Sequence, residues 1–154
     1  TGCEKKEEKD PDAPAMLKEA TGKVYKAKLN LNKDIEIDTN KITEEVSYYS
    51  YEYEGVVISL LAVKDKNGIN HVVINTCQSC GGSPYAYFVQ VGDKIQCQNC
   101  GNTFKIEELG NLVEDGCNPI KIDSIEENNG IITISHEELE QYKDKFENWK
   151  GPKG

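Results

Sequence analysis

The chain has 154 residues and a net charge of −9, and each of its 18 basic residues is a lysine. Nucleic-acid binding favours a basic face and bidentate arginines, so this composition argues against a nucleic-acid partner. The sequence has no apolar run long enough to span a bilayer. The length is that of one domain with a short extension, and we expect a tether over residues 1–20 and a single folded domain over residues 21–150.

The amino-terminal segment predicts a membrane anchor followed by a spacer. Cys3 comes after Thr1 and Gly2, the order found at the end of a bacterial lipobox, whose cysteine is lipidated. Residues 4–14 are charged, contain proline and have almost no apolar side chains, so they cannot bury enough surface to fold. The alternative is an unrelated free thiol. We expect a lipid-anchored protein on the extracytoplasmic face of the bacterial cell membrane.

Strand patterns follow from residue 24 onward. One strand is expected around residues 24–31 and a second at residues 35–37, with a turn at residues 32–34 between them. The tyrosine-rich run at residues 46–53 suits a pleated surface, and we expect its tyrosines to pack across strands rather than line a ligand groove. Residues 56–63 are almost continuously apolar, which predicts a strand buried on both faces.

The next strand leads directly to the first cysteines. Residues 64–68 end in Asn-Gly, a hairpin signal, and residues 69–74 form the following strand. His71 lies on this strand close to the cysteines. We interpret it as a strand residue rather than a metal ligand, because four sulfurs are already available nearby.

The central motif is a repeated Cys-x-x-Cys-Gly sequence, formed by Cys77, Cys80 and Gly81 and again by Cys97, Cys100 and Gly101. Each turn brings two sulfurs to one side of a tight loop, and two facing loops supply four thiolates at the corners of a tetrahedron. We expect the two glycines to adopt positive φ and backbone N–H groups to point at sulfur. Zinc and iron both suit such a site. Two disulfides, four unrelated thiols or a thioredoxin-like redox pair explain the repeat less well.

A module over residues 75–120 should present these two knuckles at one end of a hairpin. Residues 85–91 predict one strand, residues 92–93 the turn, and residues 94–96 the return strand. A short strand at residues 103–106 and a helical turn at residues 107–110 follow. Cys117 is an extra thiol that is either a fifth sulfur near the site or a small buried residue.

The carboxyl end predicts two strands and a helix. The strands are expected at residues 120–125 and 131–134, with a turn at residues 126–130. Ser135 with Glu138 three residues later is a capping box, and apolar residues recur at helical spacing from His136 to Trp149. His136 is not expected to bind metal. The fold class is therefore α+β and mostly β: an antiparallel, strand-rich domain with a zinc-ribbon or rubredoxin-like double-knuckle hairpin and a carboxyl-terminal helix.

Four short motifs together resemble the FtrD-like family. They are the run from Asn75 to Gly81, the Tyr-Ala-Tyr-Phe at residues 85–88, the run from Cys97 to Phe104, and the Gly-Cys-Asn-Pro-Ile at residues 116–120. The similarity covers roughly residues 41–125. The family is described as iron–sulfur-containing membrane proteins, some of which carry transmembrane helices and accompany a high-affinity iron permease. This chain differs by lacking such spans and by having Lys121 where a second proline is expected.

The resemblance implies an envelope location, metal binding at the four cysteines, and a link to iron uptake. The cofactor it implies is one metal, zinc or iron, or an iron–sulfur cluster; the implied partner is a membrane iron permease or an envelope redox protein. Electron transfer is the mechanism expected for iron. The alternatives are a purely structural zinc-ribbon interaction module and a thiol-redox or metal-chaperone protein. An enzyme acting on an organic substrate is not indicated, because the chain has no Ser–His–Asp set and no phosphate loop.

Overall fold

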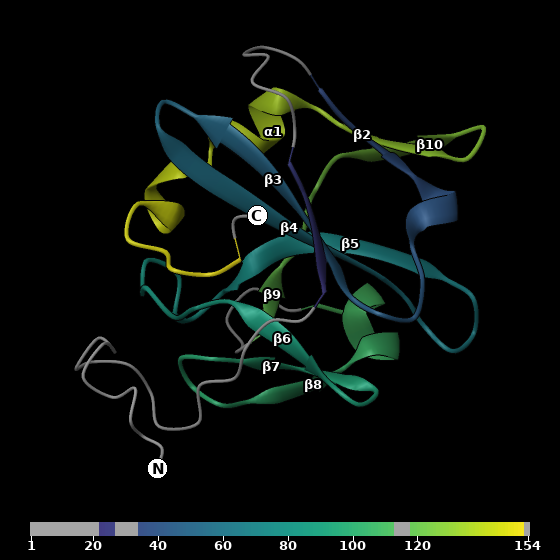
Figure 1. Ribbon diagram of the computed structural model, residues 1–154, viewed down its shortest axis with the longest axis horizontal. Coiled ribbons are helices and arrows are strands. Elements are labelled where there is room, and N and C mark those ends of the chain that lie inside the picture. The colour runs from purple at the N-terminus through teal and green to yellow at the C-terminus, as the bar shows by residue number, and fades with distance from the viewer. Residues whose placement is uncertain (1–21, 27–33, 113–117, 153–154) are drawn as a thin grey trace.

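A computed structural model describes residues 22–26, 34–112 and 118–152, which form three sheets (Figure 1). The central sheet has the strand order β1-β3-β4-β5-β9, with bounds Lys23–Lys26, Ser47–Tyr53, Val56–Lys64, Asn70–Cys77 and Pro119–Ile120. A second sheet has the order β10-β11-β2, with bounds Ile125–Asn128, Ile131–Ile134 and Ile35–Asp38. The third has the order β6-β7-β8, with bounds Phe88–Val91, Lys94–Cys97 and Thr103–Lys105.

The strand pairs are antiparallel except that β1 runs parallel to β3. Two 3₁₀ helices lie between strands, η2 at Thr39–Lys41 and η3 at Ile106–Gly110. In Figure 1 the second sheet and the third sheet lie on opposite sides of the long central strands. The predicted antiparallel, strand-rich class is confirmed.

The first two predicted strands do not form a hairpin. β1 joins the central sheet beside β3, whereas β2 joins the second sheet beside β11. Ile35 and Ile37 on β2 are buried while Glu36 between them is exposed, so this strand needs one apolar surface to cover. As part of the second sheet, β2 packs Ile35 and Ile37 in a core cluster with residues of the central sheet. Most of the predicted turn at residues 32–34 lies outside the described residues.

The central strand β4 is buried on both faces, as its apolar run predicted. Ile58 and Leu60 pack in a core cluster together with residues of the second sheet and with Trp149. Leu61 and Val63 point to the opposite face and pack in another cluster together with residues of the third sheet. Because successive side chains alternate between faces, a strand with apolar layers on both sides requires apolar residues at every position.

The tyrosines of β3 pack inside the protein, as predicted. Tyr48, Tyr49 and Tyr51 are all buried. The Tyr48 hydroxyl donates a hydrogen bond to the Phe88 carbonyl oxygen at 2.9 Å, which joins the central sheet to β6. Tyr49 stacks on Tyr25 with ring centroids 4.8 Å apart. These rings therefore contribute packing between strands and between sheets.

The carboxyl-terminal helix is shorter than the sequence predicts. α1 spans His136–Glu140, and a 3₁₀ helix, η4, spans Lys143–Phe146, in place of one helix from His136 to Trp149. Trp149 packs edge-on against Phe146 and against Tyr87, with ring centroids 5.2 Å and 5.9 Å away. A five-residue helix is not stable by its own hydrogen bonds, so contacts with the core decide the path of this segment.

Strand boundaries near residue 120 also differ from expectation. β9 ends at Ile120 and β10 begins at Ile125, so residues 121–124 belong to no strand. The turn of the β10–β11 hairpin is formed by Asn129 and Gly130, which both have positive φ, at 53° and 80°. That geometry suits a two-residue hairpin turn with glycine in second place.

Replacing Ser135 by alanine should lower the free energy of unfolding by about 1 kcal/mol. The Ser135 hydroxyl accepts a hydrogen bond from the Glu138 backbone N–H at 3.1 Å, which confirms the serine half of the predicted capping box; the Glu138 carboxylate accepts from the Asp123 N–H instead. Alanine leaves that N–H without its acceptor. Urea unfolding followed by tryptophan fluorescence measures the change, because Trp149 packs beside this segment. An unchanged midpoint would show that the cap adds no stability.

Candidate metal centre

The first knuckle begins where β5 ends. Cys77 is the last residue of β5 and pairs with Pro119 on β9. The Gln78 backbone N–H donates to the Asn118 carbonyl oxygen at 2.8 Å, which extends this pairing one residue into the loop. Cys77 is fully buried and Cys80 is half-buried. The central sheet therefore holds the inner cysteine of this pair rigidly.

The second knuckle begins where β7 ends. Cys97 is the last residue of β7 and is fully buried, whereas Cys100 is exposed. The Gly101 N–H donates to the Cys97 carbonyl oxygen at 2.8 Å and closes the loop. Gly101 has φ of 81°, as predicted for this position. A side chain is strained in that conformation, which explains why glycine follows the second cysteine.

The prediction for the glycine of the first knuckle is wrong by one residue. Gly82, with φ of 100°, takes the positive-φ conformation there, and Gly81 does not. At Gly81 a side chain would instead be crowded by its neighbours. A Cβ at Gly81 would lie 3.2 Å from Lys145 Nζ and 3.3 Å from the Cys77 carbonyl oxygen. The Lys145 side chain therefore lies against this loop.

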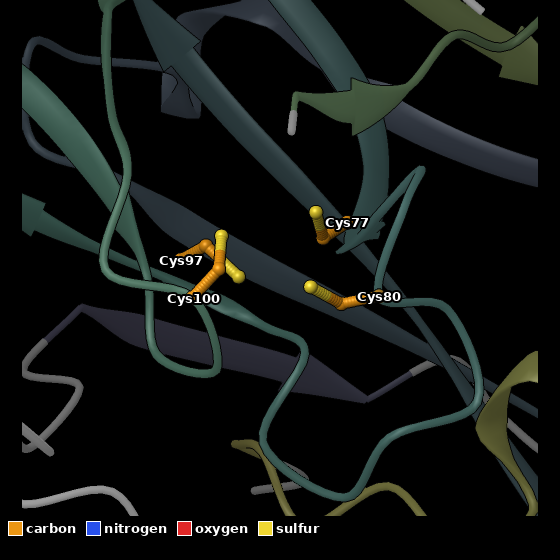
Figure 2. A group of neighbouring side chains, drawn as sticks. All are labelled: Cys77, Cys80, Cys97 and Cys100. Atoms are coloured by element: carbon orange, nitrogen blue, oxygen red, sulfur yellow. The ribbon is translucent and has the colours of Figure 1, made fainter. Parts of the chain in front are cut away.

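All four cysteines converge. Their sulfur atoms lie within 4.8 Å of one another, and Figure 2 shows the Cys77 and Cys80 side chains facing those of Cys97 and Cys100. A single tetrahedral ion with metal–sulfur bonds of about 2.3 Å places its ligands roughly 3.8 Å apart. The arrangement thus fits one ion with only small adjustments. A binuclear or larger cluster divides its cysteines among separate irons and needs a wider spread of sulfurs.

Without a bound cation, the protonated forms of Cys77 and Cys80 are favoured. A hydrogen bond with Cys97 and then burial raise the pKa of the Cys77 thiol. Burial also raises the pKa of the Cys80 thiol. The backbone N–H groups of Ser79 and Cys80 act in the other direction by donating to Cys77, as expected for a knuckle. A bound cation would stabilise the thiolates, so metal binding should release protons.

The site has an inner half and an outer half. Cys77 and Cys97 belong to the core cluster between the central and third sheets, beside Phe88 and Ile95. Cys100 lies at the surface. The sequence placed these four residues in two equivalent pairs, whereas the structure gives each pair one buried and one more accessible sulfur.

Several polar residues that support the site were not singled out from the sequence. Asn75 is fully buried; its side-chain oxygen accepts from the Phe88 N–H at 2.9 Å, and its amide nitrogen donates to Ser59 Oγ at 3.3 Å. It thereby links β5 to β6 and to β4. Gln98 is also fully buried, and its backbone N–H donates to the Tyr87 carbonyl oxygen at 2.8 Å. Both residues lie within the motifs that carry the family resemblance, which was the available signal.

Each of the two histidines lies within hydrogen-bond distance of a carboxylate. His71 Nε2 is 2.8 Å from Asp65 Oδ2, where both side chains are buried or nearly so. His136 Nδ1 is 3.1 Å from Glu140 Oε2 on α1. In the described part of the chain, the group of residues able to share a metal contains the four cysteines and neither histidine. Cys3 and Cys117 lie outside the described residues.

A family model matches residues 32–146, which is more than half of the chain; its description is "Membrane iron-sulfur containing protein FtrD-like". The chain belongs to the FtrD-like family. The match extends beyond residues 41–125, where the sequence motifs placed the resemblance. None of the described helices is long and apolar enough to cross a bilayer.

No curated protein matches this FtrD-like chain. Solved structures that do match include the quaternary ammonium Rieske monooxygenase CntA, in complex with the inhibitor MMV12 and in a study of carnitine oxidation by gut microbiota. Each is 14% identical with a TM-score of 0.44, and the match covers 70% of this chain and 32% of that one. The complex of CntA with L-carnitine gives the same score over 68% of this chain. This chain thus spans about a third of those chains.

Proposed function

We propose that Cys77, Cys80, Cys97 and Cys100 bind a single iron ion, and that the protein exchanges electrons through it during iron uptake at the cell envelope. The observation that carries this proposal is the convergence of four sulfurs within 4.8 Å in a member of an iron–sulfur family. The spread of the sulfurs favours one ion over a cluster. Residues 21–150 would be the metal-binding domain.

The arrangement of ligands favours electron transfer over chemistry on a bound substrate. Four protein sulfurs fill a tetrahedral site and leave no open position for a substrate. Iron bound there would supply a one-electron couple between its ferrous and ferric states. The buried Cys77 and Cys97 keep the geometry fixed in both states, while the exposed Cys100 gives a partner close access to the centre.

The family description and the amino-terminal sequence support the proposed location and partner. The family is described as membrane proteins, and a lipidated Cys3 followed by a tether over residues 1–20 would hold the domain at the extracytoplasmic face of the membrane. A membrane iron permease or an envelope redox protein is the proposed partner. It would exchange one electron with the centre at each encounter.

Anaerobic purification followed by elemental analysis and visible absorption tests the proposal. We expect one iron per chain and a coloured protein with sulfur-to-iron charge-transfer bands. Colourless protein with one zinc per chain would replace the proposal with a structural zinc-ribbon module, which the closed four-thiolate set also suits. Traces of metal together with quantitative disulfides would indicate a thiol-redox protein instead.

A further inference from the structure

The loops of the two knuckles are joined by a hydrogen bond between side chains outside the cysteine set. Ser83 Oγ donates to Asn99 Oδ1 at 2.8 Å. Ser83 follows the first knuckle, and Asn99 lies within the second, between Gln98 and Cys100. The bond therefore crosses from one half of the centre to the other, on the solvent side where Cys80 and Cys100 lie.

The Ser83 hydroxyl also takes part in a second hydrogen bond. The Tyr85 backbone N–H donates to Ser83 Oγ at 3.4 Å, so the hydroxyl accepts one hydrogen bond while it donates another. A serine hydroxyl has one proton to donate, and here it goes to the oxygen of Asn99. The Asn99 side chain also forms a hydrogen bond with Cys80. Because the Ser83 hydroxyl binds the amide oxygen of Asn99, the amide nitrogen is the group available to donate to the Cys80 sulfur.

We infer that Asn99 is a positioning residue of the metal centre: it donates a hydrogen bond to the Cys80 sulfur, and Ser83 holds its amide in the required orientation. This inference rests on the proposed function, since it assumes a metal at the four cysteines. A hydrogen bond donated to a thiolate withdraws electron density from the sulfur and stabilises the more negative form of the metal centre. For a four-thiolate iron site, the more negative form is the reduced one.

The reduction potential of iron-loaded protein tests the inference. Replacing Asn99 by leucine keeps the approximate volume and removes the donor, so the potential should fall. A tenfold shift of the equilibrium toward the oxidised form corresponds to about 59 mV, and we expect a fall of about this size. Asn102→Leu is the matched control, because it makes the same exchange at an exposed asparagine two residues from Cys100.

The orienting role of Ser83 is tested by a double substitution. Ser83→Ala should lower the potential less than Asn99→Leu. The double variant should match Asn99→Leu alone, because Ser83 acts only through Asn99. Additive shifts would contradict the orienting role.

A second measurement uses zinc-loaded protein and needs no redox chemistry. In the Asn99→Leu variant, the rate at which iodoacetamide alkylates Cys80, relative to Cys100, should rise several-fold. The reason is that a thiolate without a hydrogen-bond donor is more nucleophilic. Peptide mass spectrometry measures both rates. If the natural protein binds metal but the potential and the Cys80 rate stay at the values of the Asn102→Leu control, the inference is wrong and the proposed function stands. If the natural protein binds no metal, the proposed function itself fails.

Discussion

Replacing Cys97 by serine is expected to abolish stoichiometric metal binding and to destabilise the domain severely. Cys97 is fully buried, ends β7 and packs in the core cluster between the central and third sheets. Four-thiolate sites contribute on the order of 10 kcal/mol or more to folding when the metal binds. With serine at this position, only three sulfur ligands remain and the core contains a hydroxyl that has no metal to bind. Elemental analysis and thermal unfolding with and without a chelator measure both effects.

Cys117→Ser is the control for that experiment. If Cys117 is only a small buried residue, the variant should keep its full metal content and lose little stability. If its metal content falls as far as that of Cys97→Ser, a fifth sulfur belongs to the site and the four-ligand assignment is wrong. A Cys97→Ser protein that still binds one metal per chain and melts normally would contradict the central proposal.

Replacing Asn75 by leucine should lower the free energy of unfolding by about 3 kcal/mol, because the Phe88 N–H then loses its acceptor inside the core. Asn75 is fully buried and joins the strand that carries the first knuckle to β6 of the third sheet. Metal affinity should fall as well, since this link sets the distance between the two cysteine pairs. In a protein of this size, such a loss lowers the melting temperature by roughly 10 °C.

Asn102→Leu again provides the matched control, because the same change at an exposed side chain should shift stability by less than about 0.5 kcal/mol. Equal melting temperatures for Asn75→Leu and Asn102→Leu would show that the hydrogen bond to Phe88 does not hold the sheets together. Loss of metal affinity without loss of stability would instead show that Asn75 acts only on the geometry of the site.

The support for the centre depends on an irregularity in β5. The pairing of β5 with β9 shifts register between Ile74 and Cys77. A bulge in this position turns side chains away from regular alternation, which is common next to functional sites. Asn75 lies within the shifted segment and reaches β6 from there. No local pattern in the sequence marks such a bulge, because it depends on where β9 pairs.

Several features could be predicted because they depend on neighbouring residues only. The two Cys-x-x-Cys turns, the buried run of β4 and the Ser135 cap each follow from spacing or alternation within a few residues, and all three are present in the structure. The prediction of one helix from His136 to Trp149 was wrong, because the helical spacing of apolar residues does not say whether the core can accept them on a straight helix.

From the sequence by itself, the repeated Cys-x-x-Cys-Gly motif predicted that four sulfurs would meet, in preference to disulfides or unrelated thiols. Only the tertiary structure decided that Cys77 and Cys97 lie inside the core while Cys100 lies at the surface. It also decided that Ser83 meets Asn99 and that Lys145 lies against Gly81. These contacts join segments far apart in the chain, so they depend on how the sheets and the carboxyl-terminal segment pack together rather than on any local pattern.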